Sequence, residues 1–256
     1  MRLKIFLDPE NNHFVLPINY HYQLSSAIYK IFRNGSREVA SWLHDFGYKD
    51  EKGRTLKLFN FSNLHFDRYT LEKNLINCFG ATTLVFSSPL ETKLVKVFID
   101  GIFKEPLVRL RFQYGTLNFR IKTIEIQEDL LTNDIQTYSL ISPATISVQS
   151  NSNGKKRIKY LNPSDEEFSF RLSNNLKKKF KILNNIEYNG DILININSNN
   201  IKSKLITIKE GSPQEIKVKG YLFDFQMKAQ QEIHRIAYFC GIGEKNSLGF
   251  GMIEKK

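Results

Sequence analysis

The sequence predicts an α+β fold made of two successive halves with the same order of elements. Hydrophobic periodicity gives the first half the order strand, helix, strand, strand, helix, strand, with one short extra helix. The second half has the order strand, helix, strands, helix, strand. The 256 residues have room for two domains of about 125 each, with 41% hydrophobic content for their cores. Because the first order is a split β-α-β arrangement, we expect two tandem ferredoxin-like domains, at residues 1–128 and 129–256.

The first half opens with a strand and two helices. Residues 2–7 alternate apolar and charged side chains, which predicts a strand ended by the sequence PENN. A helix is predicted from about Asn19 to Arg33, and Ser36 can cap a second short helix that runs to about Phe46. The apolar stripes of the two helices are Tyr20, Leu24, Ala27, Ile28 and Ile31, then Val39, Trp42, Leu43 and Phe46.

The rest of this half contains three further strands and a helix. Alternating residues predict a strand that begins at Leu56, and strand-like sequence continues at 82–88. Helical periodicity covers 91–103, and 117–127 alternates as a strand. The polar residues 129–134 are predicted to link the two halves.

Three polar side chains of the first half lie off the apolar faces. At 100° per residue, Tyr29 lies roughly 150° from the centre of the first helical stripe, and His44 lies roughly 150° from the centre of the second. Lys57 is predicted on the strand face opposite Leu56 and Leu58. Each of the three therefore faces solvent, a cleft or a partner, and a plain surface position is the alternative.

The second half repeats the order of elements with more basic residues. We expect a strand at 136–149, then a polar loop at 150–159 with the basic cluster Lys155, Lys156, Arg157 and Lys159. Ser164 and Glu167 fit a capping box that opens the next helix. That helix ends in Lys177, Lys178, Lys179 and Lys181, where cations suit the helix dipole and a solvated end is the alternative reading. Three strands and a last helix follow: 192–196, 204–208, 215–225, and a helix with Ala229, Ile233, Ile236, Ala237 and Cys240 on one face.

A glycine-rich loop, GIGEKNSLGFG, follows the last helix and precedes a short strand at 250–254. Its successive backbone N–H groups can form a concave anion site, to which Lys245 adds a positive charge. A P-loop is excluded because Leu248 stands where that motif needs its second glycine, and Asn246 replaces the third glycine of a dinucleotide fingerprint. We expect the loop to hold phosphate, with a simple glycine-capped helix end at Gly241 as the alternative.

The charge of the chain favours a polyanionic partner. Lys and Arg number 37 against 26 Asp and Glu, a net charge of +11, and both halves share the excess. Two cysteines are too few for a disulfide framework, and no apolar run reaches the ~18 residues of a membrane span. The N-terminal residues have no signal-peptide pattern, so the expected location is the cytoplasm. The five histidines lack metal-ligand spacing, so we expect no metal site.

The carboxy-terminal pattern Gly-h-Gly-x5-Gly-h-Gly, with h apolar, resembles the Cas-six family of CRISPR repeat endoribonucleases in the RAMP superfamily. GIGEKNSLGFG matches all four glycines, and the resemblance in element order spans nearly the whole chain. It implies two ferredoxin-like domains that face each other across a cleft, and cleavage of precursor transcripts inside each repeat without a metal ion or other cofactor. The implied partners are repeat and guide RNA and a multi-subunit interference complex, with no membrane; whether the chain forms a homodimer stays open.

Many members of this family use a tyrosine on the first helix, then a histidine, then a lysine. The matching residues here are Tyr29, His44 and Lys57, the three already found off the apolar faces. The charged loop before Lys57 varies in length within the family, so Lys49, Lys52 or Arg54 is the alternative cation.

The resemblance also implies a reaction. The ribose 2′-OH attacks the adjacent phosphate and leaves a 2′,3′-cyclic phosphate and a 5′-OH. The protein must move two protons and stabilise the phosphorane. Histidine suits proton transfer near neutral pH and a lysine suits the phosphorane, while which of Tyr29 and His44 is the acid stays open.

The residues expected to bind RNA are those of the loop and of the basic cluster: Gly241, Gly243, Lys245, Asn246, Ser247, Gly249, Gly251, Lys155, Lys156, Arg157 and Lys159. Two other functions compete with the enzyme. One is a RAMP-fold scaffold that binds guide RNA without cutting it, and the other is an RNA-binding protein unrelated to CRISPR.

Overall fold

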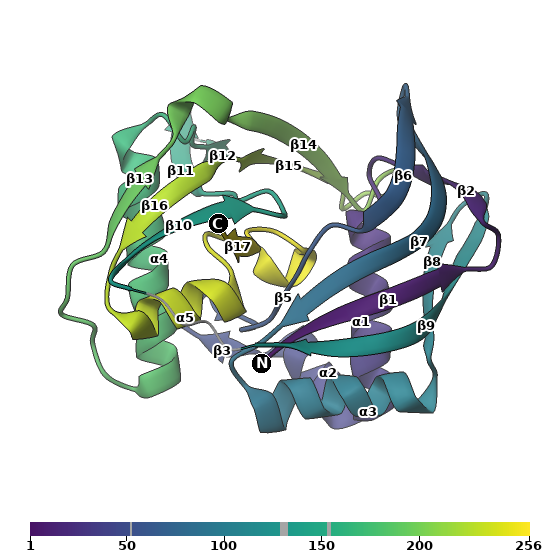
Figure 1. Cartoon of the computed structure of the whole chain (residues 1–256). Helices are drawn as coiled ribbons and strands as arrows, with labels where there is room; N and C mark the ends of the chain where they lie inside the picture. The colour runs from purple at the N-terminus through teal and green to yellow at the C-terminus, as the bar shows by residue number, and fades with distance from the viewer. Residues whose placement is uncertain (52, 129–132, 153–154) are drawn as a thin grey trace.

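The computed structural model describes residues 1–51, 53–128, 133–152 and 155–256, with side chains at all of these except 150–152 and 155–156. Figure 1 shows two sheets, each carrying its own helices, side by side. The described residues of the first half form β1 (Arg2–Pro9), β2 (His13–Pro17), α1 (His21–Gly35), α2 (Arg37–Asp45), β3 (Tyr48–Lys49), β4 (Thr55–Leu56), β5 (Asn60–Phe61), β6 (His65–Glu72), β7 (Leu75–Ser87), η1 (Glu91–Val95), α3 (Lys96–Lys104), β8 (Leu107–Phe112) and β9 (Gly115–Gln127).

The second half has the same general plan, with two added hairpins. Its described elements are β10 (Ile135–Leu140), β11 (Ser147–Ser152), β12 (Lys155–Tyr160), α4 (Glu166–Asn184), β13 (Leu193–Ile196), η2 (Ser198–Asn200), β14 (Lys202–Ile208), β15 (Ile216–Leu222), β16 (Asp224–Lys228), α5 (Gln231–Cys240), η3 (Asn246–Leu248) and β17 (Ile253–Lys255). The hairpins β11–β12 and β14–β15 stand apart from the main sheet.

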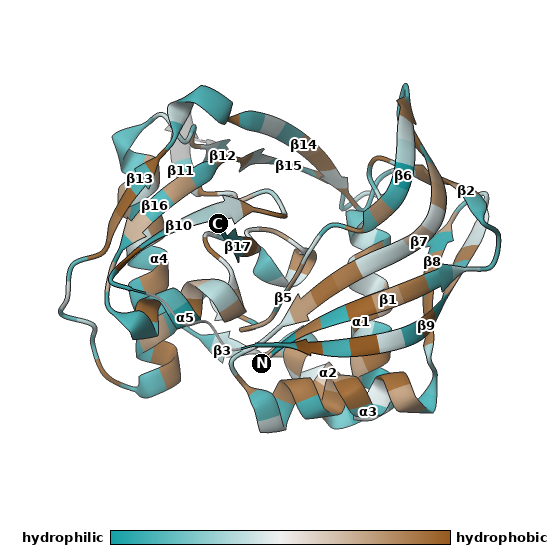
Figure 2. Ribbon diagram, in the orientation of Figure 1, coloured by the Kyte–Doolittle hydropathy of each residue, from teal (hydrophilic) through white to brown (hydrophobic). Residues whose placement is uncertain are grey.

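Strand order confirms the ferredoxin-like fold in both halves. The first sheet runs β2-β7-β1-β9-β8, with β6 on the other edge of β7, and the second runs β13-β16-β10-β17. In the split β-α-β fold the first strand pairs with the third and the fourth, and here β1 lies between β7 and β9 while β10 lies between β16 and β17. Residues of α1 and α3 share one buried core with the first sheet, and residues of α4 and α5 share another with the second. The alternation expected along β1 is visible in Figure 2, and Leu3, Ile5 and Leu7 are fully buried.

The cap predicted for the second helix is confirmed. The Ser36 hydroxyl accepts a hydrogen bond from the Val39 amide at 3.2 Å, and α2 starts at Arg37. All five apolar residues predicted for the first helix are buried, as are those of the last helix. Phe46, predicted in the stripe of the second helix, is instead exposed.

Other predicted boundaries were wrong for identifiable reasons. The strand from Leu56 is split into β4 and β5 because Leu58, at φ 54°, turns into the second core. The strand at 136–149 ends at Leu140, and 155–160 is a paired strand rather than a loop. Asp165, not Ser164, is the N-cap of α4, so the predicted capping box does not form. The linker prediction at 129–134 falls largely outside the described residues.

Three strands of the first sheet were not predicted. Almost every residue of β6 is exposed, so that strand has no apolar alternation to detect, whereas β2 and β8 do alternate buried and less buried residues and were missed. They belong to the first sheet because β7 and β9 are long enough to pair along their whole length.

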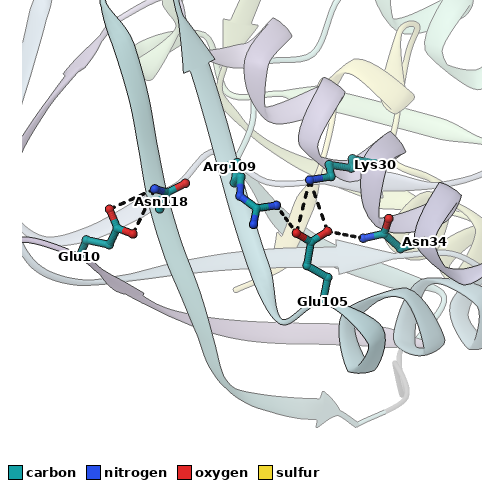
Figure 3. A network of polar contacts seen from close by, with 6 residues as sticks. All are labelled: Glu10, Lys30, Asn34, Glu105, Arg109 and Asn118. Carbon is teal, nitrogen blue, oxygen red and sulfur yellow. Dashed lines mark hydrogen bonds and ion pairs between the residues drawn. The ribbon is translucent and has the colours of Figure 1, made fainter.

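A polar network holds α1 to the start of β8 (Figure 3). The Glu105 carboxylate lies between Lys30 and Asn34 of α1 and Arg109 of β8, with the Asn34 amide donating at 2.8 Å. The Arg109 guanidinium contributes most to holding the pKa of Glu105 at about 2. This network helps fix the orientation of α1, the helix that carries Tyr29.

The two halves are joined by buried polar contacts. Arg2 is fully buried; its Nη1 donates to the Ile253 carbonyl at 2.7 Å, and its guanidinium lies 4.2 Å from the centre of the Tyr238 ring. The Ser87 hydroxyl donates to the Phe239 carbonyl at 2.9 Å. These contacts place the glycine-rich loop against the first half.

Candidate active site

The glycine-rich loop leaves α5 and folds between the two halves. All four glycines have positive φ, between 70° and 82°, and all are buried. A Cβ on Gly241 would lie 2.0 Å from Nδ2 of Asn60, and one on Gly251 would lie 1.9 Å from the Ile242 carbonyl oxygen. The glycines are therefore required by close packing, and within the loop only residues 244–248 are partly exposed.

A buried lysine supports the loop from beneath. Lys179 of α4 is 1% exposed, and its ammonium donates to the carbonyls of Gly241 (2.7 Å) and Gly243 (3.2 Å) and to Oδ1 of Asn246 (2.7 Å). Desolvation lowers the pKa of Lys179 to about 8. The Asn246 amide in turn donates to the carbonyls of Ile242 and Phe250. The side chain of Asn246, which was expected to contact RNA, is thus hydrogen-bonded within the protein and holds the loop closed.

This role of Lys179 was not predicted, because the residue stands in a run of lysines that is typical of a solvated helix end. A signal was present, because Lys179 continues the buried face of α4 formed by Phe168, Leu172 and Leu176 at steps of four, four and three. Asn60 was also missed. Its side-chain oxygen Oδ1 accepts from the Phe61 backbone N–H at 2.7 Å, and its side-chain Nδ2 is packed against Gly241.

The structure brings together Tyr29, His44 and Lys57. The rings of Tyr29 and His44 meet edge to face with centroids 6.4 Å apart, and Lys57 Nζ donates to the His44 carbonyl at 2.9 Å. Tyr29 also hydrogen-bonds the side chain of Ser247 in the loop. Three residues from separate elements thus come together, and Tyr29 connects them to the partly exposed part of the loop.

Burial shapes the chemistry of two of these groups. Desolvation raises the pKa of Tyr29 to about 12, against a smaller opposing effect of the Ser247 hydrogen bond. Desolvation also lowers the pKa of Lys57, and the nearby Asp45 charge opposes this. His44 is 79% exposed, and its Nδ1 lies 2.7 Å from Asp45 Oδ1. Since an ionised carboxylate only accepts hydrogen bonds, this contact places a proton on Nδ1, which leaves Nε2 as the acceptor nitrogen of a neutral imidazole.

The alternative cations differ from Lys57 in their partners. Arg54 is bound by Asp50 through both Nε and Nη2, at 2.8 and 2.7 Å. Lys49 is exposed on β3. Lys52 lies outside the described residues. Among the candidates that the structure describes, Lys57 is the one seen in contact with the residue carrying the imidazole.

A groove of about 730 Å³ runs beside these residues, between residues 50–51 and 54–58, α4 and the loop. Among its described lining residues, eight are basic and four acidic. The basic ones are Arg54, Lys57, Arg171, Lys177, Lys178, Lys179, Lys181 and Lys245, and the acidic ones are Asp50, Glu51, Glu187 and Glu244. Lys57 and Ser247 both line this cationic groove, whereas Tyr29 and His44 are not among its described lining residues.

The basic cluster of the second half lies elsewhere. Arg157 and Lys159 are exposed on β12, which packs beside β15 and is not among the described lining of the groove. The side chains of Lys155 and Lys156 lie outside those that the structure describes. The predicted RNA-binding residues therefore form two surfaces, one at the loop and one on this hairpin.

Comparison with known proteins identifies the family. The family model described as "CRISPR-associated protein Cas6, N-terminal" matches residues 15–125, and the model described as "CRISPR associated protein Cas6, C-terminal" matches residues 125–255. The chain belongs to the Cas6 family. Both halves are covered by these matches, in agreement with the resemblance in the glycine-rich loop.

Curated and solved Cas6 proteins match the chain from end to end. It is 24% identical to CRISPR-associated endoribonuclease Cas6 1 of Methanocaldococcus jannaschii, covering 99% of this chain and 92% of that one. It is 25% identical to CRISPR-associated endoribonuclease Cas6 of Pyrococcus furiosus, covering 99% and 89%. A solved structure described as CRISPR associated protein Cas6 aligns with a TM-score of 0.81 at 25% identity, over 100% of this chain and 99% of the other.

Two further observations concern what the described part of the Cas6 chain lacks. Its helices include none that is both long and apolar enough to cross a membrane. Its His, Cys, Asp and Glu side chains form no group of three or more placed to hold a metal ion.

Proposed function

We propose that this Cas6 protein cleaves CRISPR precursor transcripts within their repeats, by attack of a ribose 2′-OH on the adjacent phosphate, without a metal ion. The observation that carries the proposal is the meeting of Tyr29, His44 and Lys57 beside the glycine-rich loop and a cationic groove. The two curated relatives, named as CRISPR-associated endoribonucleases, support the reaction class.

The reaction needs two proton transfers and stabilisation of charge. The 2′-oxygen bonds to phosphorus as its proton goes to a base, and the bond to the 5′-oxygen breaks as an acid protonates that oxygen. His44 suits the base because Asp45 fixes the proton on Nδ1 and leaves Nε2 as an acceptor. Tyr29, with its pKa near 12, stays protonated at neutral pH and suits the acid or a group that orients the substrate.

Lys57 supplies the charge stabilisation in this scheme. Its ammonium lies at the His44 carbonyl and faces the groove, where it can approach the phosphorane oxygens. The loop and groove then hold neighbouring phosphates, so binding should weaken steeply with salt. The product carries a 2′,3′-cyclic phosphate and a 5′-OH. The guide RNA would pass to an interference complex, and a homodimer remains part of the proposal.

A single sugar substitution tests the nucleophile. Repeat RNA from the source genome should be cleaved in excess EDTA, and RNA with one 2′-deoxy sugar at the mapped cleavage position should stay intact, since it has no nucleophile there. The measurement is gel separation of end-labelled RNA, with a deoxy sugar at a distant position as control. Cleavage only when a divalent metal is added, or cleavage of the deoxy substrate at the same bond, would contradict the mechanism.

Tyr29→Phe should slow single-turnover cleavage by roughly 10- to 100-fold while preserving RNA affinity, because the ring contacts remain and the hydroxyl is lost. Because the pKa of Tyr29 is raised to about 12, the wild-type rate should show no fall due to Tyr29 ionisation up to pH 10. Tyr69→Phe, on exposed β6, is the control. An unchanged rate in Tyr29→Phe would remove the hydroxyl from the reaction.

One observation favours a second function, a scaffold that binds guide RNA without cutting it. The Tyr29 hydroxyl is hydrogen-bonded to Ser247, and Lys57 is hydrogen-bonded to a backbone carbonyl, so both groups already have partners inside the protein. Tight, salt-sensitive binding of repeat RNA that remains intact would establish the scaffold instead.

A further inference from the structure

Helix α4 has a phenylalanine in solvent and a lysine in the core. Phe170 is 67% exposed although it is one of the largest apolar side chains of the helix. At 100° per residue it lies roughly 165° from the centre of the buried face, the face that contains Lys179. The three oxygen acceptors of the loop explain the buried lysine. Nothing within the described residues explains an exposed ring on the opposite face.

Phe170 lines the groove together with other residues of the same face of α4. Phe170, Asn174, Lys177 and Lys181 follow one another at steps of four, three and four residues, which places them on one stripe of α4. All four line the groove. From Phe170 to Lys181 the helix rises about 16 Å. The stripe therefore presents an aromatic ring, an amide and then two lysines along the groove, of which Lys181 is ion-paired with Glu51 and Glu187.

Other exposed aromatic side chains do not share this position. Phe46, Tyr69, Phe103 and Tyr114 are also more than half exposed, and none of them is among the described residues that line the groove. An aromatic face in line with cations matches a ligand that alternates flat rings with negative charges, as single-stranded RNA does. Such a ligand explains both kinds of side chain on the stripe.

Resting on the proposed function, we propose that Phe170 stacks on one unpaired base of the RNA held in the groove. Asn174, one turn further along, lies where its amide can meet the edge of that base, and Lys177 meets the phosphate that follows. Phe170 is thus a binding residue that sets the register of the RNA, and it takes no part in the proton transfers.

Affinity measurements on four variants test the stacking. The probe is the repeat RNA with every sugar 2′-O-methylated, which cannot react through a 2′-OH, read by fluorescence anisotropy. Phe170→Ala should bind about 10- to 100-fold more weakly. Phe170→Leu should weaken binding similarly, because it keeps apolar bulk but loses the ring, whereas Phe170→Trp should stay within about threefold of wild type. Phe103→Ala changes a phenylalanine of α3 that is also more than half exposed, and it should bind as wild type.

A scan of single abasic positions locates the base. At one position the loss from the abasic sugar and the loss from Phe170→Ala should fail to add, because both remove the same contact. Wild-type affinity of Phe170→Ala or Phe170→Leu, or affinity losses that add at every abasic position, would overturn the inference about Phe170. If the wild-type protein still cleaves unmodified repeat RNA, the proposed function stands in that case. A wild-type protein that neither binds nor cleaves repeat RNA would overturn both.

Discussion

Replacing His44 with alanine should slow cleavage of repeat RNA by about 10²- to 10⁴-fold and leave RNA affinity within about threefold of wild type. The loss follows from the removal of the group that takes or gives a proton in the transition state. Folding should be unaffected, because the His44 side chain is mostly exposed and contacts Tyr29 only at a ring edge. Single-turnover rates with enzyme in excess measure the effect on the chemical step.

The matched control is His13→Ala, since His13 is another exposed histidine and lies on β2, stacked on Phe79. It should cleave at the wild-type rate. The cleavage rate of Asp45→Asn should lie between the rates of His44→Ala and His13→Ala, because the imidazole remains but loses the carboxylate that fixes its tautomer. A His44→Ala protein that cleaves as fast as His13→Ala would discard His44 from the site and keep the enzyme.

Lys179→Met should lower the free energy of unfolding by about 3 kcal/mol and weaken RNA binding. Three oxygens of the loop, those of Gly241, Gly243 and Asn246, lose their common donor while they stay buried. The part of the loop that faces the groove then loses its support. Lys177→Met makes the same change on the opposite face of α4, where the lysine is half-buried, and should alter stability by less than about 0.5 kcal/mol. Urea denaturation measures both variants, and equal stability for the two would contradict this role.

The stability difference between wild type and Lys179→Met should also depend on pH. Burial lowers the pKa of Lys179 to about 8, whereas an unfolded lysine titrates near 10.4. Between these values the unfolded chain holds one proton more than the native protein, so the free energy of unfolding of wild type rises with pH. The gap to Lys179→Met should therefore widen by about 2 to 3 kcal/mol from pH 8 to above pH 10. A constant gap would mean that the ammonium is not held in a desolvated site.

Local pattern was sufficient to predict much of the fold. The apolar stripe of α1, the Ser36 cap of α2 and the face of α5 were readable because 3.6-residue periodicity and capping depend on neighbours in sequence. The exposed strand β6 and the break at Leu58 were not readable. Their conformations depend on pairing with β7 and on packing into the other domain.

The sequence by itself determined which residues stand off the apolar faces, the glycine pattern of the loop and the excess of positive charge. These features need only the local chain, and together they indicated Tyr29, His44 and Lys57. The tertiary structure alone decided that these three come together, that Tyr29 reaches Ser247 of the loop, that Lys179 lies under the loop and that Phe170 lines the groove. Tyr29 and Ser247 stand 218 positions apart in the sequence. Contact between residues so far apart forms only when the two domains pack together.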